Sequence, residues 1–267
     1  MKMYLSIFRV RFINSLQYRA VVIGAIMKGF LYAFMEILAY AALYRSGQFS
    51  FPFAFSQMVS YVWVQETFLV LFVVVFGDGE IYSAIGDGSI AYDLVRPVSL
   101  YGRWFCQSAA NRLAFTVVNC LPVLLLAFFM PEPFRASLPP SVGQALLFLV
   151  STVLAFSVVV SFAMLMYVSL FYTISQRGVR IIVTAVTSFL SGGIVPLPFF
   201  PAPILAVVRF LPFAAMQNMP LQIYAGALLG VDALRGIAFQ IVWLAALVLL
   251  GRLAMRRALR KVIVQGG

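Results

Sequence analysis

The chain has 267 residues, of which 63% are hydrophobic and only 10% are charged. An ordinary soluble domain is roughly half apolar and about a quarter charged, so most of this chain is expected to face lipid. The composition excludes a cytosolic enzyme, an intrinsically disordered protein and a secreted disulfide scaffold. The net charge of +11 has to be interpreted by position, because basic residues orient the helices of a membrane protein. The chain has no histidine, which removes the commonest metal ligand and general base.

Residues 1–19 are expected to form an amphipathic helix on the membrane surface. Leu5, Phe8, Phe12 and Leu16 recur at helical spacing, and basic residues lie between them. Basic groups favour anionic lipid headgroups, which suits a helix that lies in the interface. The segment lacks the apolar region and cleavage site of a signal peptide. The alternative is a simple basic flank of the first span.

Six apolar stretches predict six transmembrane helices in a single all-α membrane domain. A span needs about 20 apolar residues. The stretches cover residues 20–44, 53–76, 104–130, 144–174, 179–195 and 234–255. With the N-terminus inside, 14 of the 19 basic residues fall on the cytoplasmic side of this map. Because cytoplasmic loops collect lysine and arginine, both termini are expected in the cytoplasm.

The inner connection, residues 77–103, differs from the spans in its chemistry. It holds four of the eight acidic residues, and five glycines divide it into short pieces. Residues 89–95 are long enough for about two helical turns, and Pro97 ends them because proline disfavours helix at the preceding residue. The mixed charges predict a surface that faces water or another protein.

The outer connection, residues 196–233, contains six of the 13 prolines. They separate apolar pieces such as residues 204–211, which are too short to cross a bilayer and too hydrophobic for an open loop. Such pieces satisfy their backbone groups against neighbouring spans. The pattern therefore predicts re-entrant or interfacial helices before the last span.

The sequence contains no ATP-binding loop. The nearest match, residues 24–30, has two correctly spaced glycines, but phenylalanine stands where lysine is required and the match lies inside the first span. Residues 78–80 and 87–89 lack the later ligands of a calcium loop. No catalytic motif is present. We expect no catalytic residue, no metal site and no cofactor on this chain, and no binding of nucleic acid.

Charged residues inside the predicted spans are candidates for a translocation path. Lys28, Glu36 and Glu66 each cost roughly 2–3 kcal/mol or more in lipid unless they are buried in protein or water. Lys28 and Glu36 have an alternative, in which their side chains reach the headgroup layer. Glu66, beside Gln65 in mid-span, is hardest to place in lipid. It either lines the path or bonds to a neighbouring helix.

The inner connection also carries a motif. It reads Gly88-Ser89-Ile90-Ala91-Tyr92-Asp93-Leu94-Val95-Arg96-Pro97-Val98-Ser99. This stretch resembles a glycine-to-arginine–proline segment of ABC-2 type transporter permeases, the membrane subunits of ABC exporters. The layout of the whole chain is similar as well, from the N-terminal amphipathic helix to the proline-rich outer helices before the sixth span.

The resemblance implies that residues 77–103 contain a coupling helix, which docks in a groove of a separate ABC ATPase subunit. By position, the coupling residues are Asp87, Gly88, Tyr92, Asp93, Arg96 and Pro97. It also implies that ATP and magnesium bind to the partner ATPase, and that the chain pairs with a second permease, identical or sister, in the inner membrane of a bacterial cell. The alternative for Arg96 and Pro97 is that they merely end a helix above anionic headgroups.

We therefore expect the permease subunit of an ATP-driven exporter, which is not itself an enzyme. One alternative is a stand-alone secondary transporter that is driven by protons through Glu36 or Glu66. Another is a membrane-embedded enzyme that acts on lipid, for which the intramembrane carboxylates are the only support. The family moves drugs, peptides, lipids and polysaccharides, and the sequence does not choose among these substrates.

Overall fold

The computed structural model describes residues 2–15, 19–47, 51–76, 78–95, 97–173 and 175–260. Within these ranges every regular element is a helix, which confirms an all-α membrane protein. The elements are α1 (Lys2–Ser15), α2 (Arg19–Ser46), α3 (Phe55–Thr67), α4 (Leu69–Phe72), α5 (Gly79–Gly86), α6 (Ile90–Leu94), α7 (Leu100–Phe129), α8 (Val142–Ser169), η1 (Leu170–Tyr172), α9 (Gln176–Leu190), η2 (Leu197–Phe199), α10 (Ala202–Val208), η3 (Pro212–Ala215), α11 (Asn218–Tyr224) and α12 (Gly230–Leu259).

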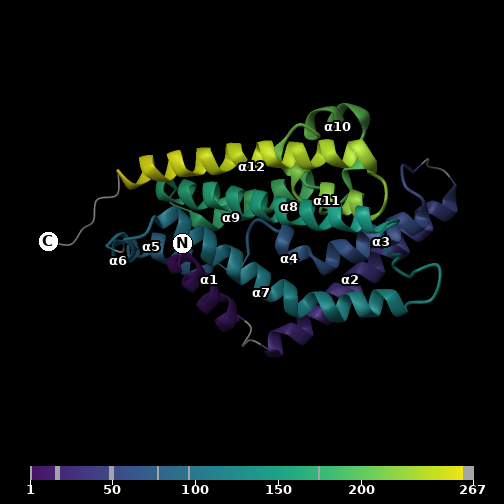
Figure 1. Cartoon of the computed structure of the whole chain (residues 1–267), viewed down its shortest axis with the longest axis horizontal. Coiled ribbons are helices and arrows are strands. Elements are labelled where there is room, and N and C mark those ends of the chain that lie inside the picture. The colour runs from purple at the N-terminus through teal and green to yellow at the C-terminus, as the bar shows by residue number, and fades with distance from the viewer. Residues whose placement is uncertain are drawn as a thin grey trace.

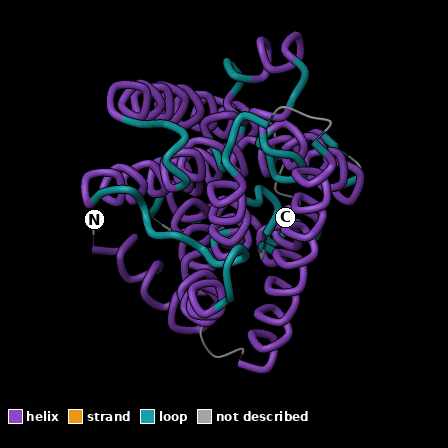
Figure 2. The backbone as a smooth tube through the Cα atoms, turned by 90° about the vertical axis from the view of Figure 1, so that its right-hand side faces the viewer, coloured by secondary structure: helices purple, strands orange, loops and turns teal. Residues whose placement is uncertain are grey.

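The long helices run roughly along the longest axis of the molecule (Figure 1). α5, α6, the beginning of α1 and the C-terminal end of α12 gather at one end, called here the α5–α6 end. The C-terminal end of α2, the start of α3 and the connection from α7 to α8 lie at the opposite end. Viewed along that axis, the chain is a bundle of helices joined by loops (Figure 2).

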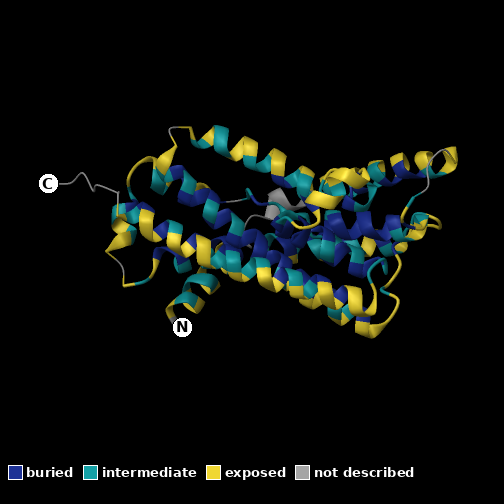
Figure 3. Cartoon of the chain, turned by 90° about the horizontal axis from the view of Figure 1, so that it is seen from above, coloured by how far each residue is buried: buried dark blue, intermediate teal, exposed yellow. Residues whose placement is uncertain are grey.

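Helix α8 forms the centre of the bundle. It packs along α12 and also contacts α7, α9 and α11. Val158, Val160 and Ala163 on α8 are completely buried, and small or β-branched side chains of this kind let neighbouring helices approach closely. Helix α12 instead exposes apolar side chains such as Val242 and Leu249, as expected of a surface that meets lipid. Figure 3 shows the same gradient, with buried residues inside and exposed residues along the outer helices.

Among the described residues, four helices are long and apolar enough to cross a membrane. They are Gly24–Ser46, Leu100–Phe129, Val142–Tyr172 and Gly230–Leu259. These four coincide with the first, third, fourth and sixth spans that the sequence predicts. The predicted second and fifth spans take other forms, so the count of six crossings stays a prediction.

The predicted second span, residues 53–76, is not one continuous helix. Helix α3 has 13 residues, and the four-residue helix α4 follows it after a single residue. The guanidinium of Arg112, on α7, accounts for the end of α4. It donates hydrogen bonds to the carbonyl oxygens of Val73 and Val74, the second at 2.6 Å. These carbonyls are therefore satisfied by a side chain instead of by another helical turn.

The predicted fifth span, residues 179–195, corresponds to α9. This helix has 15 residues and ends at Leu190, which gives it a length of about 22 Å. Gly192 follows with a φ of +84°, a conformation that favours glycine and turns the chain away from the helix axis. α9 is therefore shorter than the roughly 30 Å hydrocarbon core of a bilayer.

Residues 196–233 form four short helices, η2, α10, η3 and α11, before α12 begins. The first three follow a proline or begin with one. Buried glutamines satisfy the backbone of this segment: Gln144 of α8 donates to the carbonyl of Ile223 at 2.9 Å, and Gln240 of α12 donates to that of Ala215 at 3.0 Å. Short helices that are bonded in this way can lie at membrane depth. Their re-entry into the bilayer stays a prediction.

Candidate functional site

The connection between α4 and α7 folds into the two short helices α5 and α6 at the α5–α6 end. Gly88 forms the turn between them with a φ of +78°, where residues with a side chain are strained. A carboxylate oxygen of Asp87 accepts a hydrogen bond from the backbone N–H of Ser89 at 2.9 Å. Helix α6 lies within residues 89–95, where the sequence predicts about two helical turns.

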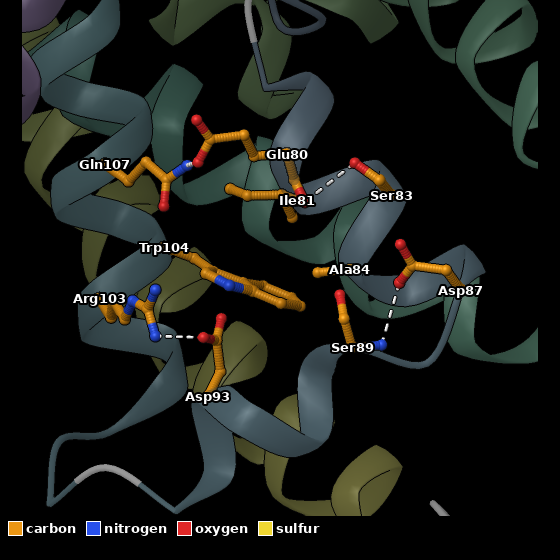
Figure 4. Close-up of a pocket in the computed structure, with 10 residues that line it drawn as sticks. All are labelled: Glu80, Ile81, Ser83, Ala84, Asp87, Ser89, Asp93, Arg103, Trp104 and Gln107. Atoms are coloured by element: carbon orange, nitrogen blue, oxygen red, sulfur yellow. Dashed lines mark hydrogen bonds and ion pairs between the residues drawn. The ribbon is translucent and has the colours of Figure 1, made fainter.

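Helices α5, α6 and α7 surround a polar hollow of about 290 Å³. Figure 4 shows that side chains from opposite sides of this hollow point toward one another. Arg103 of α7 donates to Asp93 of α6, and both side chains are mostly buried. Gln107 of α7 donates from Nε2 to Oε2 of Glu80 on α5 at 3.2 Å. Each of the two short helices is thus tied to α7.

Helix α1 provides another tether for α5. The guanidinium of Arg11 contacts both carboxylate oxygens of Glu80, at 2.6 Å from Nη1 to Oε1 and 2.5 Å from Nη2 to Oε2. A two-point contact of this kind fixes orientation as well as distance. Hydrogen bonding from Arg11 lowers the pKa of Glu80 below its usual value. Glu80 is therefore ionised at neutral pH, although its exposure makes the pair a weak contributor to stability.

The residue that precedes α5, Asp78, is held by a buried polar network. Its Oδ2 atom lies 3.6 Å from Nη2 of Arg112, and neither side chain is exposed. The same oxygen accepts hydrogen bonds from the hydroxyl groups of Ser108, at 3.1 Å, and Tyr167. Ser108 and Arg112 lie on α7, and Tyr167 lies on α8. The network therefore joins the start of α5 to both long helices.

Burying the charged groups of this network carries a large desolvation cost. Burial raises the pKa of Asp78 above its usual value, and the charge of Arg112 is the main influence that opposes this rise. A buried ion pair repays its desolvation only when further hydrogen bonds satisfy both partners. Arg112 has such bonds, because it donates to two backbone carbonyls and, from Nε, to Ser108 at 3.2 Å. Oδ2 of Asp78 accepts from Ser108 and Tyr167, whereas its Oδ1 atom is buried without a hydrogen-bond partner among the described residues. Removing either charged partner would leave the other buried without its counter-charge.

Two apolar side chains, one on α6 and one just after it, are exposed. Tyr92 is 78% exposed and Val95 is 85% exposed. Pro97 and Asp87 are exposed as well. Arg96, the remaining predicted coupling residue in this turn, lies outside the described residues. The α5–α6 element is thus fixed to its neighbouring helices through its polar contacts, while Tyr92 and Val95 remain exposed.

The four predicted path residues lie on α2 and α3, which contact each other. Gln65 is 2% exposed, and its Oε1 atom has no hydrogen-bond partner within the described parts of the chain; the same holds for Oε1 of Glu36. The charge of Glu66 interacts with those of Glu36 and Lys28. Lys28 is exposed, and its Nζ atom lies 5.3 Å from the centre of the Tyr32 ring. The structure therefore brings Glu66 within electrostatic reach of both Glu36 and Lys28.

A model of the ABC-2 family of transporter proteins matches residues 30–266. The chain belongs to this family. The match confirms the resemblance that the inner motif and the layout of the chain carry. No curated protein and no solved structure matched the chain.

Sequence reasoning missed the buried network of this ABC-2 transporter. Asp78 is identified only as one of several acidic residues in the inner connection, and Tyr167 is indistinguishable from other aromatic residues of its span. A signal for Arg112 does exist. It lies eight residues into the predicted third span, where an arginine needs a partner inside the protein. The nearest acidic residue that follows the preceding predicted span is Asp78.

The geometry of the ABC-2 chain suits the transmission of movement. α5 and α6 are joined to α1 through Arg11, to α7 through Arg103 and Arg112, and to α8 through Tyr167. A force applied to the exposed face of this element therefore reaches three helices through charged or buried contacts. Packed helices respond to such a force by shifting as units, because their cores do not deform continuously.

Proposed function

We propose that this ABC-2 chain is the permease subunit of an ATP-driven exporter. It forms a translocation path with a second permease, identical or sister, and is coupled to separate ATPase subunits that hold ATP and magnesium. The observation that carries the proposal is the α5–α6 element, which is fixed to the membrane helices by ion pairs and leaves Tyr92 and Val95 exposed.

Exposed apolar side chains at the end of a membrane protein support a protein contact there. Tyr92 and Val95 lie beside charged residues, away from the apolar lengths of the long helices. An apolar patch with a polar rim is typical of an interaction site. The basic residues near the start of α9 and at the end of α12 lie at the same end. Since cytoplasmic segments collect such residues, we place this end and both termini in the cytoplasm, with the chain in the cell membrane.

The polar groups between α2 and α3 are the proposed lining of the path. Glu36 and Gln65 each have a buried oxygen without a hydrogen-bond partner in the structure as described. An unsatisfied buried acceptor costs about 1–3 kcal/mol, and polar groups inside the membrane usually face a path or a partner. In this proposal, the second permease or the substrate supplies the missing donors.

The first test is to purify the tagged chain from its native membrane. We expect an ABC ATPase to co-purify, and the chain alone to hydrolyse no ATP. In cells, depletion of ATP should stop transport, whereas a protonophore at constant ATP should leave it intact. The opposite pattern, with loss of transport under the protonophore alone, would support the stand-alone proton-coupled transporter.

The pair between Asp93 and Arg103 should contribute to coupling. We expect Asp93→Asn and Arg103→Gln each to lower the number of substrate molecules moved per ATP by about fivefold or more, because coupling free energies are typically at least 1 kcal/mol. The measurement is transport and ATP hydrolysis by the reconstituted complex. The double variant should be no worse than either single variant, since both remove the same contact.

Arg135→Gln is the matched control for this experiment. Arg135 pairs with Glu132 at 2.7 Å, but both side chains are exposed and lie in the connection between α7 and α8 at the opposite end. Its replacement should leave the transport stoichiometry unchanged. Strictly additive losses from Asp93→Asn and Arg103→Gln would show that the pair does not act as a unit.

A further inference from the structure

A second hollow lies away from the α5–α6–α7 site. It has a volume of about 820 Å³ and lies between α9 and the segment that links α4 to α5. One wall is Val75, and the other includes Arg177, Arg180, Ile181 and Thr184 of α9. These α9 positions are spaced by three or four residues, so they share one face of the helix. Two guanidinium groups therefore open into the same space.

No acidic side chain of the protein neutralises this hollow. The chain has eight acidic residues, and none of them lines it. Five of them form ion pairs elsewhere among the described residues: Asp78–Arg112, Glu80–Arg11, Asp93–Arg103, Glu132–Arg135 and Asp232–Arg235. Of the other three, Asp87 accepts a hydrogen bond from Ser89, and Glu36 and Glu66 lie on α2 and α3. Within the described residues, Arg177 and Arg180 therefore have no acidic partner in this hollow and are free to meet an anion from outside.

The surroundings of the two arginines indicate the kind of anion. Ile181 and Ala185 line the apolar part of the same hollow. Ile181 is 60% exposed, and Val75 forms the opposite wall of the hollow. The hollow thus combines two cationic groups near the start of α9, at the α5–α6 end, with apolar side chains one to two turns farther along the same face of the helix. This pattern complements an amphiphile with an anionic head and apolar tails.

The hollow is also connected to the α5–α6 element. The guanidinium carbon of Arg180 lies 4.3 Å from the centre of the Tyr82 ring on α5. Nε2 of Gln176, another residue of the hollow, donates to the carbonyl oxygen of Tyr82 at 3.2 Å. An occupant that orders Arg180 therefore also restrains the contact between α9 and α5.

We propose that the hollow beside α9 binds an anionic phospholipid, with its phosphate between Arg177 and Arg180 and its acyl chains against Val75, Ile181 and Ala185. The site depends on the membrane location of the chain and not on an ATPase partner. It takes lipids with a net negative headgroup, such as phosphatidylglycerol, in preference to zwitterionic phosphatidylcholine. The bound lipid holds α9 beside α5.

The test measures lipid binding by the purified full-length chain in detergent, by native mass spectrometry with phosphatidylglycerol or phosphatidylcholine added. Wild type should retain phosphatidylglycerol preferentially. The double variant Arg177→Gln/Arg180→Gln should bind it roughly tenfold or more weakly, because each basic group near a lipid headgroup contributes about as much as a few-fold change in affinity. Binding of phosphatidylcholine should not change.

Arg257→Gln/Arg260→Gln is the matched control. Both residues are exposed at the C-terminal end of α12, at the same end of the molecule and outside the hollow. This variant loses the same charge and should bind phosphatidylglycerol like wild type. Equal weakening in the two double variants would overturn the proposal in favour of general surface electrostatics.

Soluble glycerol phosphate separates a lipid from a free phosphate as the occupant. It should not displace phosphatidylglycerol, because it lacks the acyl chains that contact α9. Displacement at equal concentration would show a soluble-anion site and overturn the lipid assignment. Melting temperatures measured without added lipid identify any variant that fails to fold. The variant Arg180→Lys keeps the positive charge and should retain most of the lipid binding.

Discussion

Replacing Arg112 with methionine is expected to lower the free energy of unfolding by about 3–5 kcal/mol, the usual effect of removing one partner from a buried ion pair. The substitution leaves the carboxylate of Asp78 buried without its cation. It also removes the donors to the carbonyls of Val73 and Val74, where the chain leaves α4. The measurement is the thermal unfolding of the purified protein in detergent.

Arg135→Met is the control for this prediction. Arg135 forms an ion pair as well, but its side chain is 54% exposed, and pairs of this kind contribute at most about 1 kcal/mol. Its replacement should change the melting temperature little. Equal melting temperatures for Arg112→Met and Arg135→Met would show that the buried network does not stabilise the fold.

A second substitution keeps the test informative if Arg112→Met fails to accumulate. Arg112→Lys retains the charge, but an ammonium group cannot reach Asp78 and two carbonyls in the fixed geometry of a guanidinium. Its stability should lie between those of wild type and Arg112→Met. Wild-type stability in Arg112→Lys would mean that only the charge matters and that the bonds to Val73 and Val74 contribute nothing.

The long helices could be predicted from the sequence because lipid imposes one simple requirement on them. A segment that crosses the bilayer must be apolar over about 20 residues and satisfy its own backbone. Helices α7, α8 and α12 meet this requirement by themselves, and residues 24–46 of α2 meet it as well. Their positions therefore follow from composition, although the observed ends differ from the predicted ones by up to four residues, as for α12, which runs from Gly230 to Leu259.

The division of residues 53–76 could not be predicted in this way. The segment around Phe68 is as apolar as a spanning helix, and the end of α4 depends on Arg112, a residue from another helix. Hydropathy contains no information about such a partner. Composition alone therefore predicts correctly that this segment is hydrophobic, but it does not predict that the segment is divided into two helices.

The local fold of the α5–α6 connection was predicted in outline, because glycines and charged residues distinguish it from the apolar spans, whereas the coupling role of its residues stays a prediction. The turn at Gly88 and the helical residues that follow it match that outline. The partner of Asp93 is different, because Arg103 lies ten residues away and the sequence does not show that the chain folds back between them. Pairing across a loop depends on tertiary structure, so the ion pairs that hold α5 and α6 could be identified only from the fold.

Replacing both Tyr92 and Val95 with glutamate should strongly weaken the binding of the ATPase while leaving the permease folded. Side chains that are central to an interface typically contribute 2 kcal/mol or more, so co-purification of the ATPase should fall by about 30-fold for Tyr92→Glu/Val95→Glu. Both side chains are more than three-quarters exposed, at 78% and 85%, and they are absent from the ion pairs that hold α5 and α6. The melting temperature of the permease alone should therefore not change.

Leu138→Glu separates this effect from a general response to surface charge. Leu138 is 74% exposed and lies in the connection between α7 and α8, at the opposite end of the molecule. It should retain the ATPase at the wild-type level. Full co-purification with Tyr92→Glu/Val95→Glu would place the ATPase contact elsewhere. Loss of the ATPase together with intact folding would show that the α5–α6 element has two distinct functions. Its ion pairs would hold it to the neighbouring helices, and Tyr92 and Val95 would contact the partner.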